Sequence, residues 1–141
     1  MTPEKYIVKA AHASRSARLL LEAGENEGAC NRAYYAMFNA AHAALLWSGA
    51  HINPAETKKL NSLIAAFGRH LVLTGLIPSE LGKSLNRAES IRILADYTGE
   101  EIEQQKAAEI AELGRLFINA IEHKFCPSTK QAGNSCPSAL P

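Results

Sequence analysis

The chain has 141 residues, with 15 Lys and Arg against 14 Asp and Glu, so its formal net charge is +1. This length suits one domain with its own core, and a composition of 47% hydrophobic and 21% charged residues excludes an intrinsically disordered protein. The near-neutral charge gives no reason to expect a protein that coats nucleic acid or a membrane, and without a signal peptide or a long apolar run we expect a cytoplasmic protein with no membrane contact.

Apolar residues recur at helical spacing along almost the whole chain, and we find no alternating pattern typical of a β-strand. Thr2 and Pro3 are favourable at the start of the first helix, because Thr caps free amides and Pro lacks an amide that the first turn would leave unpaired. Glycines then separate several of the segments. The predicted helices cover about residues 3–23, 27–48, 53–73, 78–97 and 100–125.

Short turns between successive helices predict an all-α, antiparallel up-and-down bundle of about five helices over residues 1–125. Alanines line one side of the second helix, which predicts a central position for it, and Tyr34, Met37 and Phe38 on its other side are predicted to be core. Residues 126–141 hold half of the prolines and no helical period, so we expect a disordered C-terminal tail there.

Motifs for metal or cofactor chemistry are absent from the sequence. The three cysteines lack the close spacing of a metal knuckle or a redox pair. HExxH, a phosphate-cradling Gly-rich loop and GxSxG do not occur either. We therefore predict no metal site and no cofactor.

A charged pair interrupts the apolar stripe of the fourth helix. Leu81, Leu85 and Ala88 define an inward stripe whose next member is Arg92, with Asp96 one turn later. A guanidinium on an inward stripe needs a partner, and Asp96 is well placed to provide it. The pair either fixes helix packing or subunit register, or holds the Arg92 side chain ready for a phosphate.

The second helix carries a polar stripe. Asn31, Tyr35, Asn39 and His42 fall at i, i+4, i+8 and i+11, with Arg32 beside them. Such a stripe either faces water in a groove or satisfies buried polar groups of neighbouring helices. Together these residue types could bind a phosphate, stack on a base or move a proton, although His42 taken alone is typical of a hydrogen-bonded structural histidine.

Charge is distributed unevenly along the chain. Residues 1–95 hold 11 basic and 7 acidic side chains, whereas residues 96–125 hold 3 basic and 7 acidic ones. Lys5, Lys9 and His12 share one face of the first helix. This face is either an ordinary solvated surface, which we favour, or a stripe that faces phosphates.

Three segments, in this order, give the chain a family resemblance. They are NRAYYAMFNAA at 31–41, AAFGRH at 65–70 and RILADY at 92–97. The sequence resembles the small bacterial and archaeal HEPN-domain proteins over about residues 4–122. The resemblance implies a helical bundle that forms a homodimer. It also implies that the chain binds RNA or a nucleotide, because many HEPN proteins are metal-independent endoribonucleases of toxin–antitoxin, CRISPR-linked and phage-defence systems, and some act with a small nucleotidyltransferase.

One departure from the family pattern concerns catalysis. The family hallmark is an Arg, a polar residue, three to five further residues and a His. Arg92 matches the arginine, but Ile93 follows it and the chain has Asp96 and Tyr97 where the His is expected. Without an imidazole at that place, cleavage by general acid–base catalysis lacks its best candidate.

We therefore expect a dimeric module that binds RNA or a nucleotide and acts with a partner such as a nucleotidyltransferase. The expected binding residues are Arg32, Tyr35, Asn39, His42 and Arg92.

Two alternatives remain open. The chain could be a ribonuclease toxin that uses Arg92, Asp96, Tyr97 and His42 for catalysis. It could also be a purely structural dimer in which Arg92 and Asp96 set the register.

Overall fold

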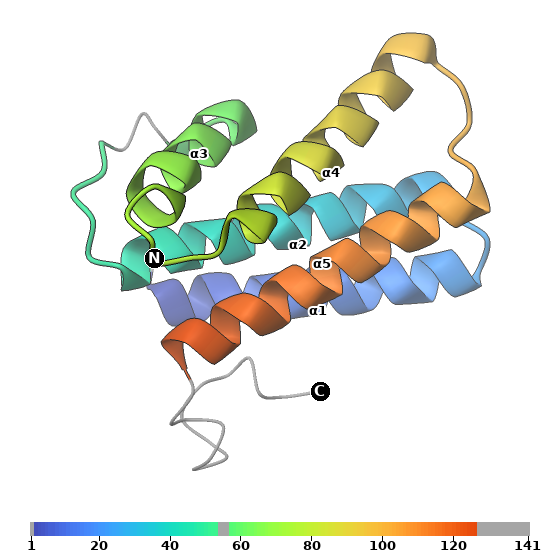
Figure 1. Ribbon diagram of the computed structural model, residues 1–141. Helices are drawn as coiled ribbons and strands as arrows, with labels where there is room; N and C mark the ends of the chain where they lie inside the picture. The colour runs from blue at the N-terminus through green and yellow to red at the C-terminus, as the bar shows by residue number, and fades with distance from the viewer. Residues whose placement is uncertain (1, 54–56, 127–141) are drawn as a thin grey trace.

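The computed structural model describes residues 2–53 and 57–126, and these residues form an all-helical bundle without a β-strand (Figure 1). The predicted all-α fold is therefore confirmed. The helices are α1 (Pro3–Glu22), α2 (Asn26–Trp47), α3 (Leu60–Phe67), α4 (Ser79–Thr98) and α5 (Gln104–Phe125), and α3 continues into a short π-helical turn, η2 (Gly68–Val72). Among the described residues, none of these helices has the length and apolarity needed to cross a membrane.

The second helix is central, as its alanines predicted. It packs against each of the other four helices, and its alanines at positions 33, 36, 40, 43 and 44 are all buried. Small side chains let a neighbouring helix approach closely. The closest approach on α5 is at Gly114, where an added Cβ atom would lie 3.4 Å from the carbonyl oxygen of Ala33.

Two predicted helix starts are wrong. The third helix begins at Leu60 and not near residue 53, and the described residues 57–59 before it are not α-helical. The fifth begins at Gln104 and not at residue 100. Here the side-chain amide of Asn26 donates to the carbonyl oxygen of Ile102 at 3.1 Å, which holds this segment against α2 in a non-helical conformation.

The C-terminal half of α4 leaves the bundle. Figure 1 shows α4 leaning away from α2 and α5 toward its C-terminal end. Leu85 and Ala88 are buried, whereas the later apolar residues Ile93, Leu94 and Tyr97 are 54%, 63% and 89% exposed. The apolar stripe of α4 therefore reaches the core only in its first half. The tail predicted for residues 126–141 lies outside the described residues, apart from Cys126.

Candidate functional site

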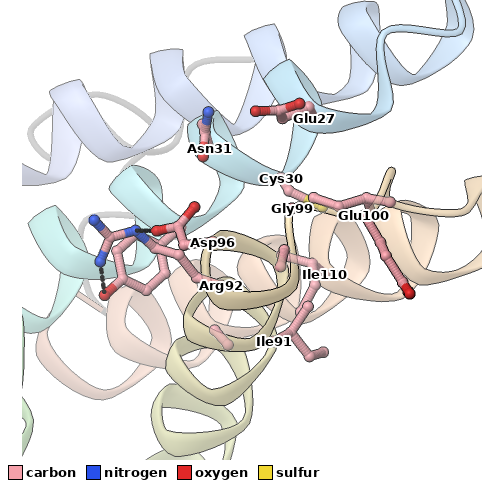
Figure 2. Close-up of a pocket in the computed structure, with 13 residues that line it drawn as sticks. Glu27, Cys30, Asn31, Ile91, Arg92, Asp96, Gly99, Glu100 and Ile110 are labelled. Atoms are coloured by element: carbon pink, nitrogen blue, oxygen red, sulfur yellow. Dashed lines mark hydrogen bonds and ion pairs between the residues drawn. The ribbon is translucent and has the colours of Figure 1, made fainter.

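A cavity of about 200 Å³ lies where α2, the second half of α4 and the loop between α4 and α5 meet (Figure 2). We call it the Arg92 pocket. α2 contributes Tyr34 and Asn31 to its lining, and α4 contributes Arg92 and Asp96. The lining residues are Glu27, Cys30, Asn31, Tyr34, Ala88, Ile91, Arg92, Ala95, Asp96, Gly99, Glu100, Ile102 and Ile110.

The principal partner of Arg92 is a tyrosine. The Nη1 atom of Arg92 donates to the hydroxyl oxygen of Tyr34 at 3.1 Å, and the guanidinium carbon lies 4.7 Å from the centre of the Tyr34 ring. The Nε atom of Arg92 is 4.0 Å from a carboxylate oxygen of Asp96 (Figure 2). The ring of Tyr34 therefore supports the guanidinium from α2, across the interface between the two helices.

The predicted burial of Arg92 is wrong. The side chains of Arg92 and Asp96 are 46% and 72% exposed, because α4 has already left the bundle at this point. An exposed ion pair at this distance contributes little to stability, between about 0 and 1 kcal/mol. Among the described residues, no carboxylate lies at short range from the N–H groups of Arg92, and a guanidinium of this kind is suited to binding a phosphate.

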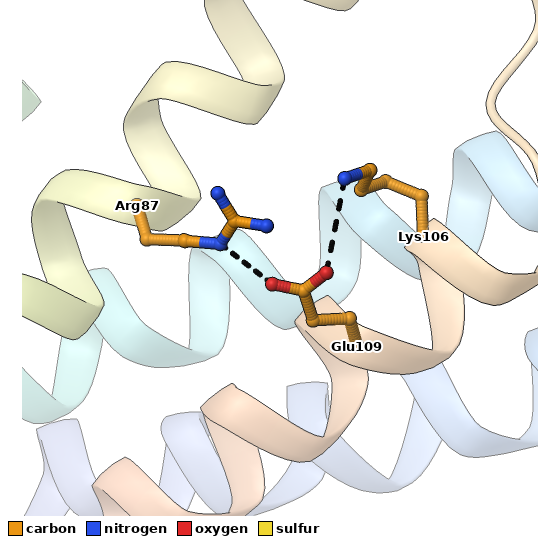
Figure 3. A network of polar contacts seen from close by, with 3 residues as sticks. All are labelled: Arg87, Lys106 and Glu109. Carbon is orange, nitrogen blue, oxygen red and sulfur yellow. Dashed lines mark hydrogen bonds and ion pairs between the residues drawn. The ribbon is translucent and has the colours of Figure 1, made fainter.

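A second arginine on the same helix provides a contrast (Figure 3). The Nε atom of Arg87 lies 2.6 Å from a carboxylate oxygen of Glu109, whose other oxygen is 3.8 Å from Lys106 Nζ. This network links α4 to α5 and holds the pKa of Glu109 below its usual value, chiefly through the hydrogen bond from Arg87. Glu109 thus neutralises the charge of Arg87, whereas the charge of Arg92 is largely not neutralised.

Burial sets the protonation state of Tyr34. Burial raises the pKa of its hydroxyl, and the hydrogen bond and positive charge of Arg92 offset this only in part. The hydroxyl is therefore neutral at physiological pH and has its own proton to donate. The sequence predicted Tyr34 to be a core residue, because it lies on the same side of α2 as Met37 and Phe38. The ring is half-buried, but its hydroxyl belongs to the site.

A shallow groove lies on the other side of the Arg92–Tyr34 pair. We call it the Tyr35 groove, and it shares Arg92 and Tyr34 with the Arg92 pocket. The two depressions are therefore joined at these side chains. Its lining residues are Tyr34, Tyr35, Phe38, Lys59, Asn61, Glu89, Arg92 and Ile93.

The first half of the predicted polar stripe on α2 faces solvent. Asn31, Arg32 and Tyr35 are exposed. The guanidinium carbon of Arg32 lies 4.9 Å from the centre of the Tyr35 ring, and Lys9 Nζ on α1 lies 5.8 Å from it. A hydrogen bond from Lys9 holds the pKa of Tyr35 below its usual value. The structure thus gathers two cations around one exposed aromatic ring.

The second half of the stripe packs inside the bundle, so of the two alternatives for the stripe, exposure to solvent applies only to its first half. Asn39 is 2% exposed, and its amide donates to the carbonyl oxygen of Tyr35 at 3.0 Å. The half-buried His42 ring stacks on Tyr6 of α1, with ring centres 4.1 Å apart, and meets Phe38 edge-on. Helical spacing places His42 only about 20° from Asn31 around the axis of α2, so its burial follows from the contact with α1 and not from a turn of the stripe.

The predicted catalytic residues do not form one cluster. Burial lowers the pKa of His42, which is packed against α1, whereas Arg92 and Asp96 line the pocket beside α4. Tyr97 is 89% exposed and lines neither depression. Among the described residues, no group of three or more His, Cys, Asp and Glu side chains could hold a metal ion.

A family model described as "HEPN domain" matches residues 3–124, which include all five helices. The chain belongs to the HEPN domain family. It is 34% identical over 127 residues to a UPF0332 protein of Gloeobacter violaceus, an alignment that covers 86% of this chain and 97% of the relative. A UPF0332 protein of Thermotoga maritima is 36% identical over 118 residues, covering 82% and 84% of the two chains.

A third relative has a name that mentions an activity. It is a Methanocaldococcus jannaschii protein named "Putative toxin", and it is 32% identical over 107 residues that cover 76% of each chain. The family match confirms the resemblance drawn from the three sequence segments. In this HEPN chain the two depressions at Arg92 have no histidine in their lining.

Proposed function

We propose that this HEPN protein is a homodimeric module that binds RNA or a nucleotide at the Arg92–Tyr34 pair. The observation that carries the proposal is the position of the Arg92 guanidinium, which is exposed, supported by a tyrosine ring and placed between two depressions. A guanidinium supplies the charge and the paired N–H groups that phosphate oxygens accept. The neutral hydroxyl of Tyr34 adds one more donor beside it.

Binding is better supported than cleavage. The alternative, a metal-independent endoribonuclease, would need a group that moves a proton near Arg92. His42 is the histidine proposed for that task, but its ring packs on Tyr6 and lines neither depression. Asp96 and Tyr97 are exposed, and Tyr97 lines neither depression.

The purely structural alternative is also less well supported. A pair that sets the register of a dimer would have a short, well-formed contact. Arg92 and Asp96 are 4.0 Å apart. The short ion pair of α4 is instead the one between Arg87 and Glu109, at 2.6 Å, and it joins α4 to α5 of the same chain.

The proposed biological setting is a toxin–antitoxin or defence-type system. Support comes from the name of the Methanocaldococcus jannaschii relative and from the family membership. A small nucleotidyltransferase is the proposed partner, on the resemblance of the sequence to HEPN proteins that act with such enzymes. The exposed apolar end of α4 supports the homodimer, because Ile93, Leu94 and Tyr97 would otherwise face water.

The test is equilibrium binding of a fluorescein-labelled single-stranded RNA and of AMP, followed by anisotropy and calorimetry. Replacing Arg92 by Ala removes the guanidinium, and we expect affinity for the bound ligand to fall at least tenfold, or about 1.4 kcal/mol. Arg87→Ala, five residues earlier on α4, is the matched control and should stay within about twofold.

The RNA is run on a denaturing gel after each measurement, with EDTA present. Intact RNA is the expected result. Cleavage by the wild type that Arg92→Ala abolishes would establish the endoribonuclease alternative. A wild type that binds neither RNA nor AMP, or variants at positions 92 and 87 with equal effects, would contradict the proposed function.

A further inference from the structure

A cluster outside the Arg92 pocket gathers positive charge around one tyrosine. Lys9 on α1 and Arg32 on α2 lie 5.8 Å and 4.9 Å from the centre of the Tyr35 ring. All three side chains are exposed. In the described part of the chain, the ion pairs formed by carboxylates involve other cations, so neither Lys9 nor Arg32 is neutralised.

Two cations that converge without a counter-ion repel one another, and an anion placed between them would relieve that repulsion. The tyrosine ring offsets part of the cost through its negative face. The lowered pKa of Tyr35 reports the same positive potential at the hydroxyl oxygen. Two cations and a hydroxyl group form a donor set suited to a phosphate group.

This cluster is continuous with the proposed binding site. Tyr35 lines the Tyr35 groove together with Arg92 and Tyr34, and Lys59 adds a further cation to that lining. Glu89 is the acidic residue in the same groove. The groove therefore runs from the guanidinium of Arg92 to Tyr35, the side chain beside which Lys9 and Arg32 lie.

We propose that Lys9, Arg32 and Tyr35 form a second phosphate subsite, which binds the backbone of a single-stranded RNA whose neighbouring nucleotide lies at Arg92. This inference rests on the proposed function and makes it more specific, since a strand engages both subsites and a mononucleotide engages one. It also assigns a role to Lys9 on the first helix. The spacing of Lys5, Lys9 and His12 left two alternatives for that face, an ordinary solvated surface or a stripe that faces phosphates.

The test measures how RNA affinity depends on salt concentration. A single-stranded 12-nucleotide RNA is titrated with wild type and with the double variant Lys9→Ala/Arg32→Ala from 50 to 300 mM NaCl. Each phosphate that is no longer neutralised reduces the magnitude of the slope of log K against log salt by about 0.7, so we expect a decrease of about 0.7 when the double variant loses the second subsite. Affinity at the lowest salt concentration should fall at least tenfold.

Lys83→Ala/Lys124→Ala is the matched control, because it removes the same charge from two exposed positions on α4 and α5. Its slope should equal that of the wild type, and its melting temperature should match that of the test variant. AMP, which engages a single subsite, should lose less affinity than the RNA in Lys9→Ala/Arg32→Ala.

Equal salt slopes for Lys9→Ala/Arg32→Ala and Lys83→Ala/Lys124→Ala would overturn the second subsite. It would also be overturned if Lys9→Ala/Arg32→Ala weakened the binding of AMP as strongly as the binding of RNA. These results are separable from failure of the proposed function. If wild type binds RNA and Arg92→Ala weakens it, the proposed function stands even where the slope of the double variant is unchanged. If wild type binds AMP but not RNA, only the second subsite fails, and if it binds neither, both fail.

Discussion

Arg92 and Arg87 lie on the same helix, and their charges have different partners. Glu109 meets Arg87 at 2.6 Å, whereas Arg92 rests on the ring of Tyr34 with Asp96 at 4.0 Å. The sequence could predict the i, i+4 neighbour of Arg92, since that relation depends only on helical spacing. It could not predict the contact with Tyr34, which depends on how α4 crosses α2.

The two adjacent tyrosines of α2 should ionise in a defined order. Burial disfavours the phenolate of Tyr34 and raises its pKa, whereas the hydrogen bond from Lys9 favours the phenolate of Tyr35 and lowers its pKa. We therefore expect Tyr35 to lose its proton at a lower pH than Tyr34. Tyrosinate absorbance during an alkaline titration, compared among wild type, Tyr34→Phe and Tyr35→Phe, measures the order.

Lys9→Ala provides the control for this titration. It should move the Tyr35 transition to higher pH and leave the Tyr34 transition in place. A Tyr34 transition that precedes the Tyr35 transition would contradict the environments described for these two side chains.

At the scale of helices, apolar spacing and capping residues predicted five elements and the central place of α2. The start of α5 could not be predicted, since it depends on a tertiary contact. The bond from Asn26 to Ile102 spans two distant parts of the chain, and it decides where α5 begins. The sequence could not predict which residues of the polar stripe on α2 are exposed for a related reason, because spacing alone does not show where α1 covers Asn39 and His42.

Gly114 tests the packing of α5 on α2. An added Cβ would sit 3.4 Å from the carbonyl oxygen of Ala33 and 3.6 Å from Met37, which is ordinary contact. Gly114→Ala should therefore stabilise the fold by up to about 1 kcal/mol through helix propensity. Gly114→Leu should overpack the interface and destabilise the fold by about 1–3 kcal/mol. Urea denaturation measures both free energies of unfolding, and a tolerated Leu would show that the two helices are not closely packed there.

At the scale of the whole molecule, the C-terminal end of α4 presents three neighbouring apolar side chains that a single chain leaves exposed. Ile93, Leu94 and Tyr97 are exposed, although the same helix buries Leu85 and Ala88 in its first half. A protein of this size seldom presents such a surface without a partner. The family resemblance predicted a homodimer from sequence, but the surface itself emerges only from the direction in which α4 leaves the bundle.

A charge at Leu94 should disrupt the proposed homodimer. Leu94 is 63% exposed in the single chain, so Leu94→Glu should leave the circular dichroism spectrum unchanged while raising the dissociation constant of the dimer at least tenfold. Sedimentation equilibrium measures that constant. Leu73→Glu, at a position that is 81% exposed beyond the end of η2, is the control and should dimerise like wild type. A wild type that sediments as a monomer at micromolar concentration would refute the dimer.

The central claim is that RNA binds across the Arg92–Tyr34 pair, and ultraviolet crosslinking tests it most directly. A single-stranded RNA containing 4-thiouridine is irradiated with the protein, and the crosslinked residues are located by mass spectrometry after trypsin digestion. We predict crosslinks at Tyr34 and Tyr35, in the peptide that follows Arg32, and their loss in Arg92→Ala. Crosslinks confined to other helices, crosslinks that persist in Arg92→Ala, or the absence of any crosslink would contradict the claim.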